Sequence, residues 1–200
     1  MKTKACIITA SRSEYGLLRW VMETIKSDSC FELQIIATGA HLSPEYGLTY
    51  REIEKDGFKI DAKVEMLVSA DTATGVAKSM GLCAIGMSDA FMRLAPDFIV
   101  VLGDRYELLP VCSTALVMRI PIVHISGGDI TEGAIDNEVR NAVSQMASLH
   151  FPGTEESAKR LEKMGIARDR IVVVGEPGLD AFRKLPLLSR SEISQRLGLN

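Results

Sequence analysis

The sequence lacks the features of several common functional classes. Its four cysteines, at positions 6, 30, 83 and 112, form no CxxC pair, and none stands at metal-ligand spacing from one of the three histidines. The net charge is −3 and no dense basic cluster is present, so nucleic acid and membrane surfaces are not expected partners. Apolar stretches such as residues 120–125 are far too short to span a bilayer, and residues 1–10 do not look like a signal peptide. We therefore expect a cytoplasmic protein without a metal site.

The loop after the first strand has a single glycine, Gly16. It is neither the G-x-G-x-x-G fingerprint nor a P-loop, so no dinucleotide cofactor is indicated. The N–H groups and dipole of the helix that follows still make an anion site, and Arg12 could add a bidentate contact to phosphate. The alternative is that Ser11 or Ser13 caps the helix while Arg12 lies in solvent.

Strand and helix patterns alternate along the chain, which predicts an α/β fold with a doubly wound parallel sheet. A Met- and Ala-rich helix, residues 72–94, is typical of a core or a subunit interface. The last twenty or so residues hold two weak helical patterns and no further strand. We expect strands at 5–9, 33–38, 58–67, 98–102, 122–125, 150–151 and 171–174, and helices at 15–25, 44–55, 72–94, 108–118, 135–148 and 155–164.

Two carboxylates follow neighbouring buried strands. Asp104 comes after Gly103, and Asp129 after Gly127 and Gly128. Because ligands bind beyond the carboxyl ends of parallel strands, both aspartates are expected in one cleft, where they could divide acid and base roles. The alternative for each is to cap the next helix.

Other polar residues near these loops allow two readings each. Arg105 could pair with Asp104 or bind phosphate, and Glu107 suits the dipole of the helix that follows. His41 is either an exposed loop histidine or part of the cleft. His124 and His150 lie in apolar strands, and both are better explained as core histidines.

Six motifs together resemble the hydrolysing UDP-N-acetylglucosamine 2-epimerases of sialic and related nonulosonic acid biosynthesis. The resemblance implies a Rossmann-like N-terminal domain, residues 1–178, of a GT-B-like two-domain enzyme, with 179–200 beginning the connection to an absent C-terminal domain. It also implies a homodimer or higher homo-oligomer, and no cofactor. The motifs are Ser-Arg-Ser-Glu-Tyr-Gly at 11–16, Thr-Gly-Ala-His-Leu at 38–42, Tyr-Gly at 46–47, Gly-Asp-Arg-Tyr-Glu at 103–107, His-Ile-Ser-Gly-Gly-Asp at 124–129 and Gly-Ala-Ile-Asp at 133–136.

The resemblance further implies a reaction. The proton on C2 of UDP-N-acetylglucosamine leaves as the C1–oxygen bond breaks. Water then adds to the 2-acetamidoglucal at C1, and a proton returns to C2 on the other face, giving N-acetylmannosamine and UDP. By motif, the catalytic acids would be Asp104, Asp129 and Asp136. The residues that bind substrate or nucleotide would be Arg12, Gly16, His41, Arg105 and Glu107.

Departures from the family pattern leave alternatives open. Members often carry glutamate at the position of Asp129, some carry an acid or histidine at that of Ser126, and histidine is common at that of Asn141. A GDP-linked sugar, a non-hydrolysing 2-epimerase and a non-catalytic Rossmann-type ligand-binding or oligomerisation module therefore remain alternatives.

Overall fold

A single six-stranded parallel sheet organises the chain. The computed structural model describes residues 2–132, 135–184 and 188–198. The strand order is β3-β2-β1-β4-β5-β6, so the chain winds outward from β1 in one direction and from β4 in the other. The predicted α/β, doubly wound sheet is therefore confirmed. The strands are β1 (Thr3–Thr9), β2 (Phe31–Thr38), β3 (Ala62–Val64), β4 (Phe98–Leu102), β5 (Ile122–Ile125) and β6 (Leu149–Phe151).

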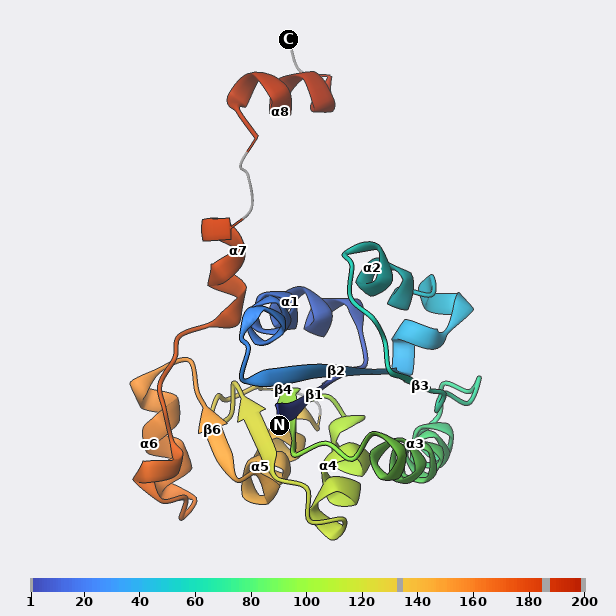
Figure 1. Cartoon of the computed structure of the whole chain (residues 1–200), viewed down its shortest axis with the longest axis vertical. Coiled ribbons are helices and arrows are strands. Elements are labelled where there is room, and N and C mark those ends of the chain that lie inside the picture. The colour runs from blue at the N-terminus through green and yellow to red at the C-terminus, as the bar shows by residue number, and fades with distance from the viewer. Residues whose placement is uncertain (1, 133–134, 185–187, 199–200) are drawn as a thin grey trace.

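Helices cover both faces of the sheet, as Figure 1 shows. On one face lie α1 and α2, and on the other lie α3, α4 and α5, while α6 flanks β6. At the C-terminal end, α7 leads to α8, which stands away from the sheet. The helices are α1 (Arg12–Ser27), α2 (Tyr50–Lys55), α3 (Ala73–Leu94), α4 (Leu108–Val117), α5 (Asp136–Met146), α6 (Glu155–Lys163), α7 (Asp180–Lys184) and α8 (Arg190–Leu197).

The core forms two layers because the strands are apolar on both faces, as expected for a parallel sheet. Met87 and Phe91 of α3 pack with Ile8 and Ile99 on one face. On the other, Leu18 of α1 belongs to the second cluster. This double burial fixes the strands and so determines where their polar ends emerge.

Three predicted elements differ in the structure. Residues 44–55 do not form one helix, because Gly47 and Leu48 adopt positive φ angles of 83° and 51° and leave only α2 as α-helix. Of the predicted strand at 58–67, only β3 pairs with the sheet. Residues 171–174 form an isolated bridge at Ile171 rather than a strand. Val174 donates its N–H to the carbonyl of Pro152, but proline has no N–H to continue the ladder.

Candidate active site

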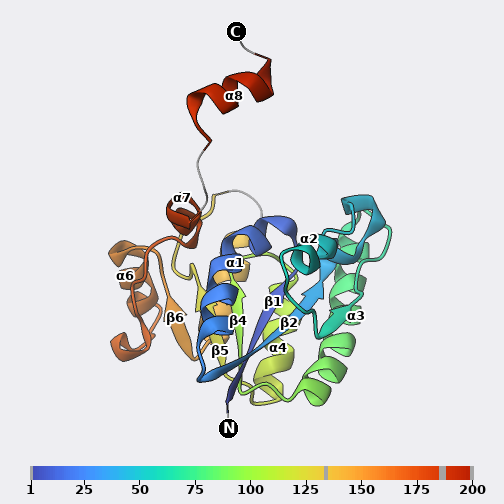
Figure 2. The same cartoon turned by 45° about the horizontal axis from the view of Figure 1, so that its top comes forward.

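The carboxyl ends of β4 and β5 lie side by side. Leu102 is in register with Ile125, and Gly103 donates its N–H to the carbonyl of Ile125 at 3.0 Å. Figure 2 shows the strands running upward from the N-terminus toward this edge. Asp104 and Asp129 therefore leave adjacent strand ends, and both are partly exposed. The structure brings the two carboxylates to one edge, as the sequence predicts.

Asp104 is held by groups from the next loop and helix. It forms an ion pair with Arg140 of α5 and accepts a hydrogen bond from the Thr131 hydroxyl at 3.2 Å. Arg140 also donates to Thr131 at 2.8 Å, and its side chain is only 8% exposed. The helix after Asp104 begins at Leu108, with Glu107 at its N-cap position. Asp104 is thus oriented by a buried guanidinium and does not cap a helix.

Asp129 is held from the other side by α6. Its Oδ1 accepts a hydrogen bond from the Ser157 hydroxyl at 2.5 Å. Gly128 makes this approach possible, because its φ is +81° and a Cβ there would lie 2.3 Å from the Ser157 carbonyl oxygen. Burial raises the pKa of the nearby Glu176 carboxyl. The charge of Asp129 raises this pKa further, and the charge of Arg140 lowers it.

Asp136 is the first residue of α5, one turn before Arg140. Residues four apart lie on the same face of a helix, so α5 brings Asp136 toward the arginine that holds Asp104. Gly133 and Ala134, which belong to the same motif, lie outside the described residues. The structure therefore places Asp104 and Asp129 at adjacent strand ends and Asp136 at the start of the helix that holds Asp104, and the catalytic role of all three stays a prediction.

A second cluster of acidic side chains lies in the segments that follow β1 and β4, which are neighbours in the sheet. Arg105 donates to Glu107 Oε1 at 2.7 Å, so it pairs with Glu107 and not with Asp104. Glu107 is 1% exposed and Glu14 is 5% exposed. Burial raises the pKa of Glu14 from 4.5 to about 7, an effect that Arg105 opposes and Glu107 adds to. This edge therefore holds two buried carboxyl groups, of which Glu107 is hydrogen-bonded to the guanidinium of Arg105.

His41 is fully buried in the chain. Its Nε2 lies 3.0 Å from the Thr9 hydroxyl and its Nδ1 lies 2.8 Å from the Thr49 hydroxyl. Burial lowers the pKa of His41 to about 4, so the ring is neutral at physiological pH. These contacts join the end of β1 to the segment before α2, and substrate binding by His41 stays a prediction.

The start of α1 is open to solvent. Ser11 is the N-cap and its hydroxyl accepts from the Glu14 N–H, while Arg12 is exposed. Gly16 faces open space, because a Cβ there would meet nothing within 4 Å. Ser11 therefore caps the helix and Arg12 lies in solvent, as the alternative to an anion site has it. Binding of an anion by this helix terminus and Arg12 stays a prediction.

His124 is a core histidine, as the sequence favours. Its Nε2 donates to the Gly103 carbonyl at 2.8 Å, so Nδ1 carries no proton and accepts from the Ser144 hydroxyl at 3.1 Å. Burial lowers the pKa of His124 to about 4. A Cβ at Gly127 would lie 2.9 Å from Nδ1, so this hydrogen bond also requires the glycine. His124 thus ties the β4 turn to α5.

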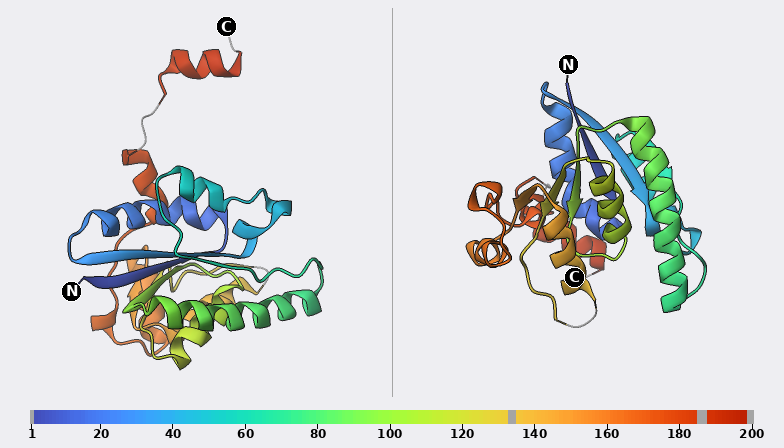
Figure 3. Two further views of the ribbon diagram at one scale, coloured as in Figure 1. Left: turned by 45° about the vertical axis from the view of Figure 1, so that its right-hand side comes forward. Right: turned by 90° about the horizontal axis from the view of Figure 1, so that it is seen from below.

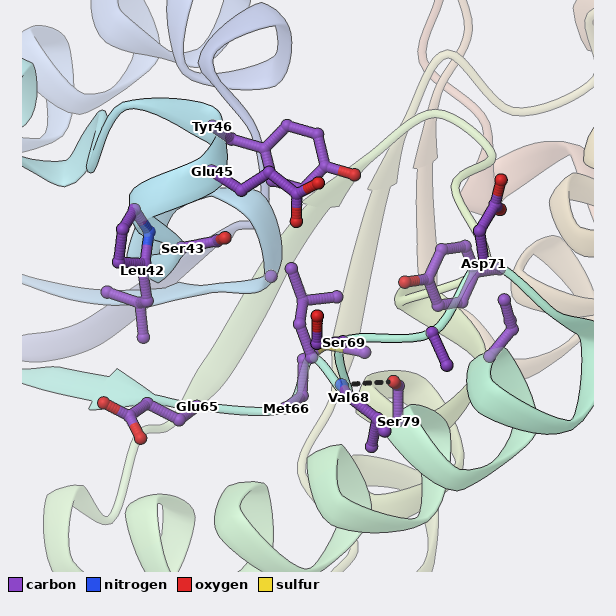
Figure 4. Close-up of a pocket in the computed structure, with 16 residues that line it drawn as sticks. Leu42, Ser43, Glu45, Tyr46, Glu65, Met66, Val68, Ser69, Asp71 and Ser79 are labelled. Carbon is purple, nitrogen blue, oxygen red and sulfur yellow. Dashed lines mark hydrogen bonds between the residues drawn. The ribbon is translucent and has the colours of Figure 1, made fainter.

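A cavity of about 850 Å³ opens beside this edge, beyond the ends of β2 and β3. Figure 4 shows Tyr46 and Glu45 on one side of it and Asp71 on another. Tyr106 lines the cavity from the loop before α4. Gly39 also lines it and lies beside the buried carboxylates, because a Cβ placed on Gly39 would be 3.3 Å from Glu107 Oε1. Tyrosines and carboxylates suit a ligand that carries hydroxyl or amide groups.

Several residues of this edge were not singled out from the sequence. Arg140 and Ser157 reach it from α5 and α6, and their role depends on tertiary packing. Glu14 had a local signal, because Ser11-x-x-Glu14 before an apolar run is a capping-box pattern. Its carboxylate accepts from the Ala10 N–H at 2.8 Å.

Among the described residues, no group of three or more His, Cys, Asp or Glu is placed to hold a metal ion. No helix in the described ranges is long and apolar enough to cross a membrane.

The profile of one protein family, described as UDP-N-acetylglucosamine 2-epimerase, matches residues 23–199. The chain belongs to this family. A GDP/UDP-N,N'-diacetylbacillosamine 2-epimerase (hydrolyzing) from Campylobacter jejuni is 45% identical over 98% of the chain and 51% of its own length. A UDP-N,N'-diacetylbacillosamine 2-epimerase (hydrolyzing) from Legionella pneumophila is 34% identical over 100% of the chain and 53% of its own length.

This epimerase-family chain also shares the fold of solved family members. The UDP-GlcNAc 2-epimerase from Neisseria meningitidis bound to UDP-GlcNAc superposes with a TM-score of 0.84 and 18% identity, over 98% of this chain and 53% of that one. The chain spans about half the length of the curated relatives it matches. The predicted family and the Rossmann-like half of a GT-B-type fold are therefore confirmed.

Proposed function

We propose that this chain supplies one side of the active site of a hydrolysing sugar-nucleotide 2-epimerase. The observation that carries the proposal is that Asp104 and Asp129 follow adjacent strand ends, and that each is held by a side chain from a different helix. Two carboxylates on neighbouring strand ends can reach opposite faces of one sugar carbon. Epimerisation at C2 needs this, because the proton leaves one face and returns to the other.

The chemistry assigns a role to each group. One aspartate takes the C2 proton while the C1–oxygen bond breaks and the nucleoside diphosphate leaves with the bonding electrons. Water then adds its hydroxyl to C1 of the glycal while the other acid, in its protonated form, gives a proton to C2. The proton that water loses returns to that carboxylate, which restores it for the next turnover. Asp136, at the start of the helix that carries Arg140, would act as the third acid. Arg12 and the start of α1 contact the leaving diphosphate, and Arg105 and Gly16 complete the binding side. The buried Glu107 and His41 support this side from within the fold, Glu107 by holding Arg105 and His41 by joining Thr9 to Thr49.

Two substrates are compatible with this chemistry. UDP-N-acetylglucosamine is the substrate that the motifs imply. The names of the relatives at 45% and 34% identity favour nucleotide-linked N,N'-diacetylbacillosamine, with UDP or GDP as the nucleotide. This sugar carries a second acetamido group, for which the cavity lined by Tyr46, Asp71 and Tyr106 offers hydrogen-bonding partners. We therefore place the diacetamido sugar ahead of N-acetylglucosamine.

Residues 1–178 form the first domain in this proposal, and 179–200 begin the connection to a second. Relatives about twice as long support it, as does α8, which buries none of its residues. A second domain could also pack into an apolar cavity of about 900 Å³ between α1 and strands β4–β6. This cavity is lined by Val123, Phe151 and Leu179, among others. The 200-residue chain alone is expected to turn over little or no substrate.

The test is product analysis in heavy water. A form of the protein as long as its relatives is incubated with UDP-N-acetylglucosamine and, separately, with UDP- and GDP-linked N,N'-diacetylbacillosamine, and the products are followed by NMR. We expect a free 2-epimeric sugar with deuterium at C2, and release of nucleoside diphosphate. A product still joined to the nucleotide would establish the non-hydrolysing alternative. Protium retained at C2 would rule out proton exchange there.

A further inference from the structure

A carboxyl group from the segment that follows α6 reaches the active-site edge of the sheet. This segment runs parallel to β6, because His150 and Ile171 form a parallel bridge and Val172 donates its N–H to the His150 carbonyl at 2.9 Å. The segment therefore passes β6 in the direction of the carboxyl ends of the strands, where Glu176 stands. In Figure 3 it leads to α7, in red, on the side of the sheet that carries α1, in blue.

The Glu176 side chain lies on Gly153, just before the start of α6. A Cβ placed on Gly153 would be 1.5 Å from Glu176 Oε1 and 2.4 Å from Glu176 Cδ. The backbone of Gly153 does not adopt the positive φ that favours glycine. What distinguishes this position is the space that it leaves for the carboxylate, and a side chain there would displace Glu176.

Asp129 approaches the same segment from the loop after β5. Its Oδ1 accepts a hydrogen bond from Ser157, in the first turn of the helix that begins two residues after Gly153. The two carboxyl groups are close enough to interact, because the charge of Asp129 adds to the effect of burial in raising the pKa of Glu176. The charge of Arg140, on α5, has the opposite effect on this pKa.

The cations of the edge are unevenly distributed. The buried guanidinium of Arg140 forms its ion pair with Asp104, and this contact favours the charged form of a carboxyl group. Arg160, on α6, pairs with Glu156 and donates to a backbone carbonyl. Within the described ranges, neither arginine forms an ion pair with Glu176 or Asp129. Two neighbouring carboxyl groups without a paired cation are more stable with one proton between them than with two negative charges.

We propose that Glu176 and Asp129 share one proton, which makes Asp129 the acid and Asp104 the base of the 2-epimerisation. This inference rests on the proposed function and adds Glu176 to it as a positioning residue. Asp104 takes the C2 proton as the C1–oxygen bond breaks, and later passes it to solvent. Asp129 gives the shared proton to C2 while water adds its hydroxyl to C1, and the proton that water loses returns to the pair.

An NMR titration of the 200-residue chain tests the pair without any substrate. The side-chain carboxyl carbons are followed against pH in the unsubstituted chain and in Asp129→Asn, and Glu176→Gln assigns the Glu176 signal. Glu176 should titrate above its ordinary value of 4.5, and Asp129→Asn should move its midpoint to lower pH. A midpoint that is the same in both chains would overturn the shared proton, whatever the substrate of the enzyme is.

Kinetics of a form as long as the relatives test the role of the pair. Glu176→Gln should lower kcat on the order of tenfold, with KM nearly unchanged, and should move the fall of kcat at high pH to lower pH. It should also release the glycal into solution, because the C2 proton still leaves while its return is slow. Gly153→Ala should act in the same direction, since its Cβ displaces the Glu176 carboxylate. Glu52→Gln, at an exposed position of α2, is the matched control and should change nothing.

The outcomes separate this inference from the proposed function. Circular dichroism of each variant reports whether the fold is retained. A folded Glu176→Gln variant that loses turnover without releasing glycal and without a shifted pH profile would overturn the role of Glu176 in the return of the proton. An unsubstituted form that releases no free sugar from any of the substrates would instead overturn the proposed function.

Discussion

The raised pKa of Glu14 makes a measurable prediction about stability. Glu14 is buried at the start of α1, and its pKa rises from 4.5 to about 7, with burial as the main cause. In the pH range between these two values the folded chain holds a proton that the unfolded chain releases. A group of this kind destabilises the fold as pH rises, and the full penalty is present above the folded pKa.

The magnitude follows from the shift. One pKa unit corresponds to about 1.4 kcal/mol, so the shift from 4.5 to about 7 costs about 3 kcal/mol of unfolding free energy once Glu14 is ionised. Glu14→Gln removes the ionisation and keeps an oxygen that can accept from the Ala10 N–H. We expect the variant to gain roughly 2 to 3 kcal/mol over the unsubstituted chain at about pH 8 and well under half of that at about pH 5.

The assay is urea unfolding of both chains at the two pH values. Comparing the variant with its parent removes the contributions of other groups. These include His41, His124 and His150, whose lowered pKa values of about 4 stabilise the fold above pH 6.5 and cease to do so as pH falls toward 4. Glu32→Gln, at an exposed position of β2, controls for the loss of one charge. A gain for Glu14→Gln that is the same at both pH values would refute the reasoning.

Four further results are expected. Asp104→Asn, in a form as long as the relatives, should lower turnover by roughly 10²-fold, and near-normal turnover would remove Asp104 from the mechanism. Gly128→Ala should cost about 3 kcal/mol in urea unfolding, because its Cβ meets the Ser157 carbonyl at 2.3 Å and φ is +81°. Gly16→Ala, with nothing within 4 Å, should instead stabilise α1 by about 0.5 to 1 kcal/mol. The 200-residue chain should bind UDP weakly by calorimetry, and a micromolar or tighter constant would contradict this.

Local patterns were enough to predict the strand–helix alternation and the strand ends that carry Asp104 and Asp129. Each of these depends on residues close together in the chain. The errors arose where a distant contact or an unusual backbone conformation decided the outcome. Pro152 of one segment limits the pairing of residues 171–174, and positive φ at Leu48 interrupts a stretch that has helical composition. Arg140 holds Asp104 from 36 residues away, so no local pattern could have identified the pair.

The sequence also could not show how the arginines of the edge are used. Arg105 is paired with Glu107, and Arg140 with Asp104, so each already neutralises a carboxylate of its own chain. Arg12 is the exposed arginine of this edge, and no ion pair forms on it in the described ranges.

A nucleoside diphosphate brings two or more negative charges to an edge that also carries Asp129, Asp136 and Glu176. Coulomb repulsion opposes its binding there unless further cations approach from outside the described residues. The carboxylates that suit this edge to proton transfer therefore weaken its binding of a diphosphate. Weak UDP binding by the 200-residue chain, and tighter binding once the remaining length of the relatives is present, would both follow from that single cause.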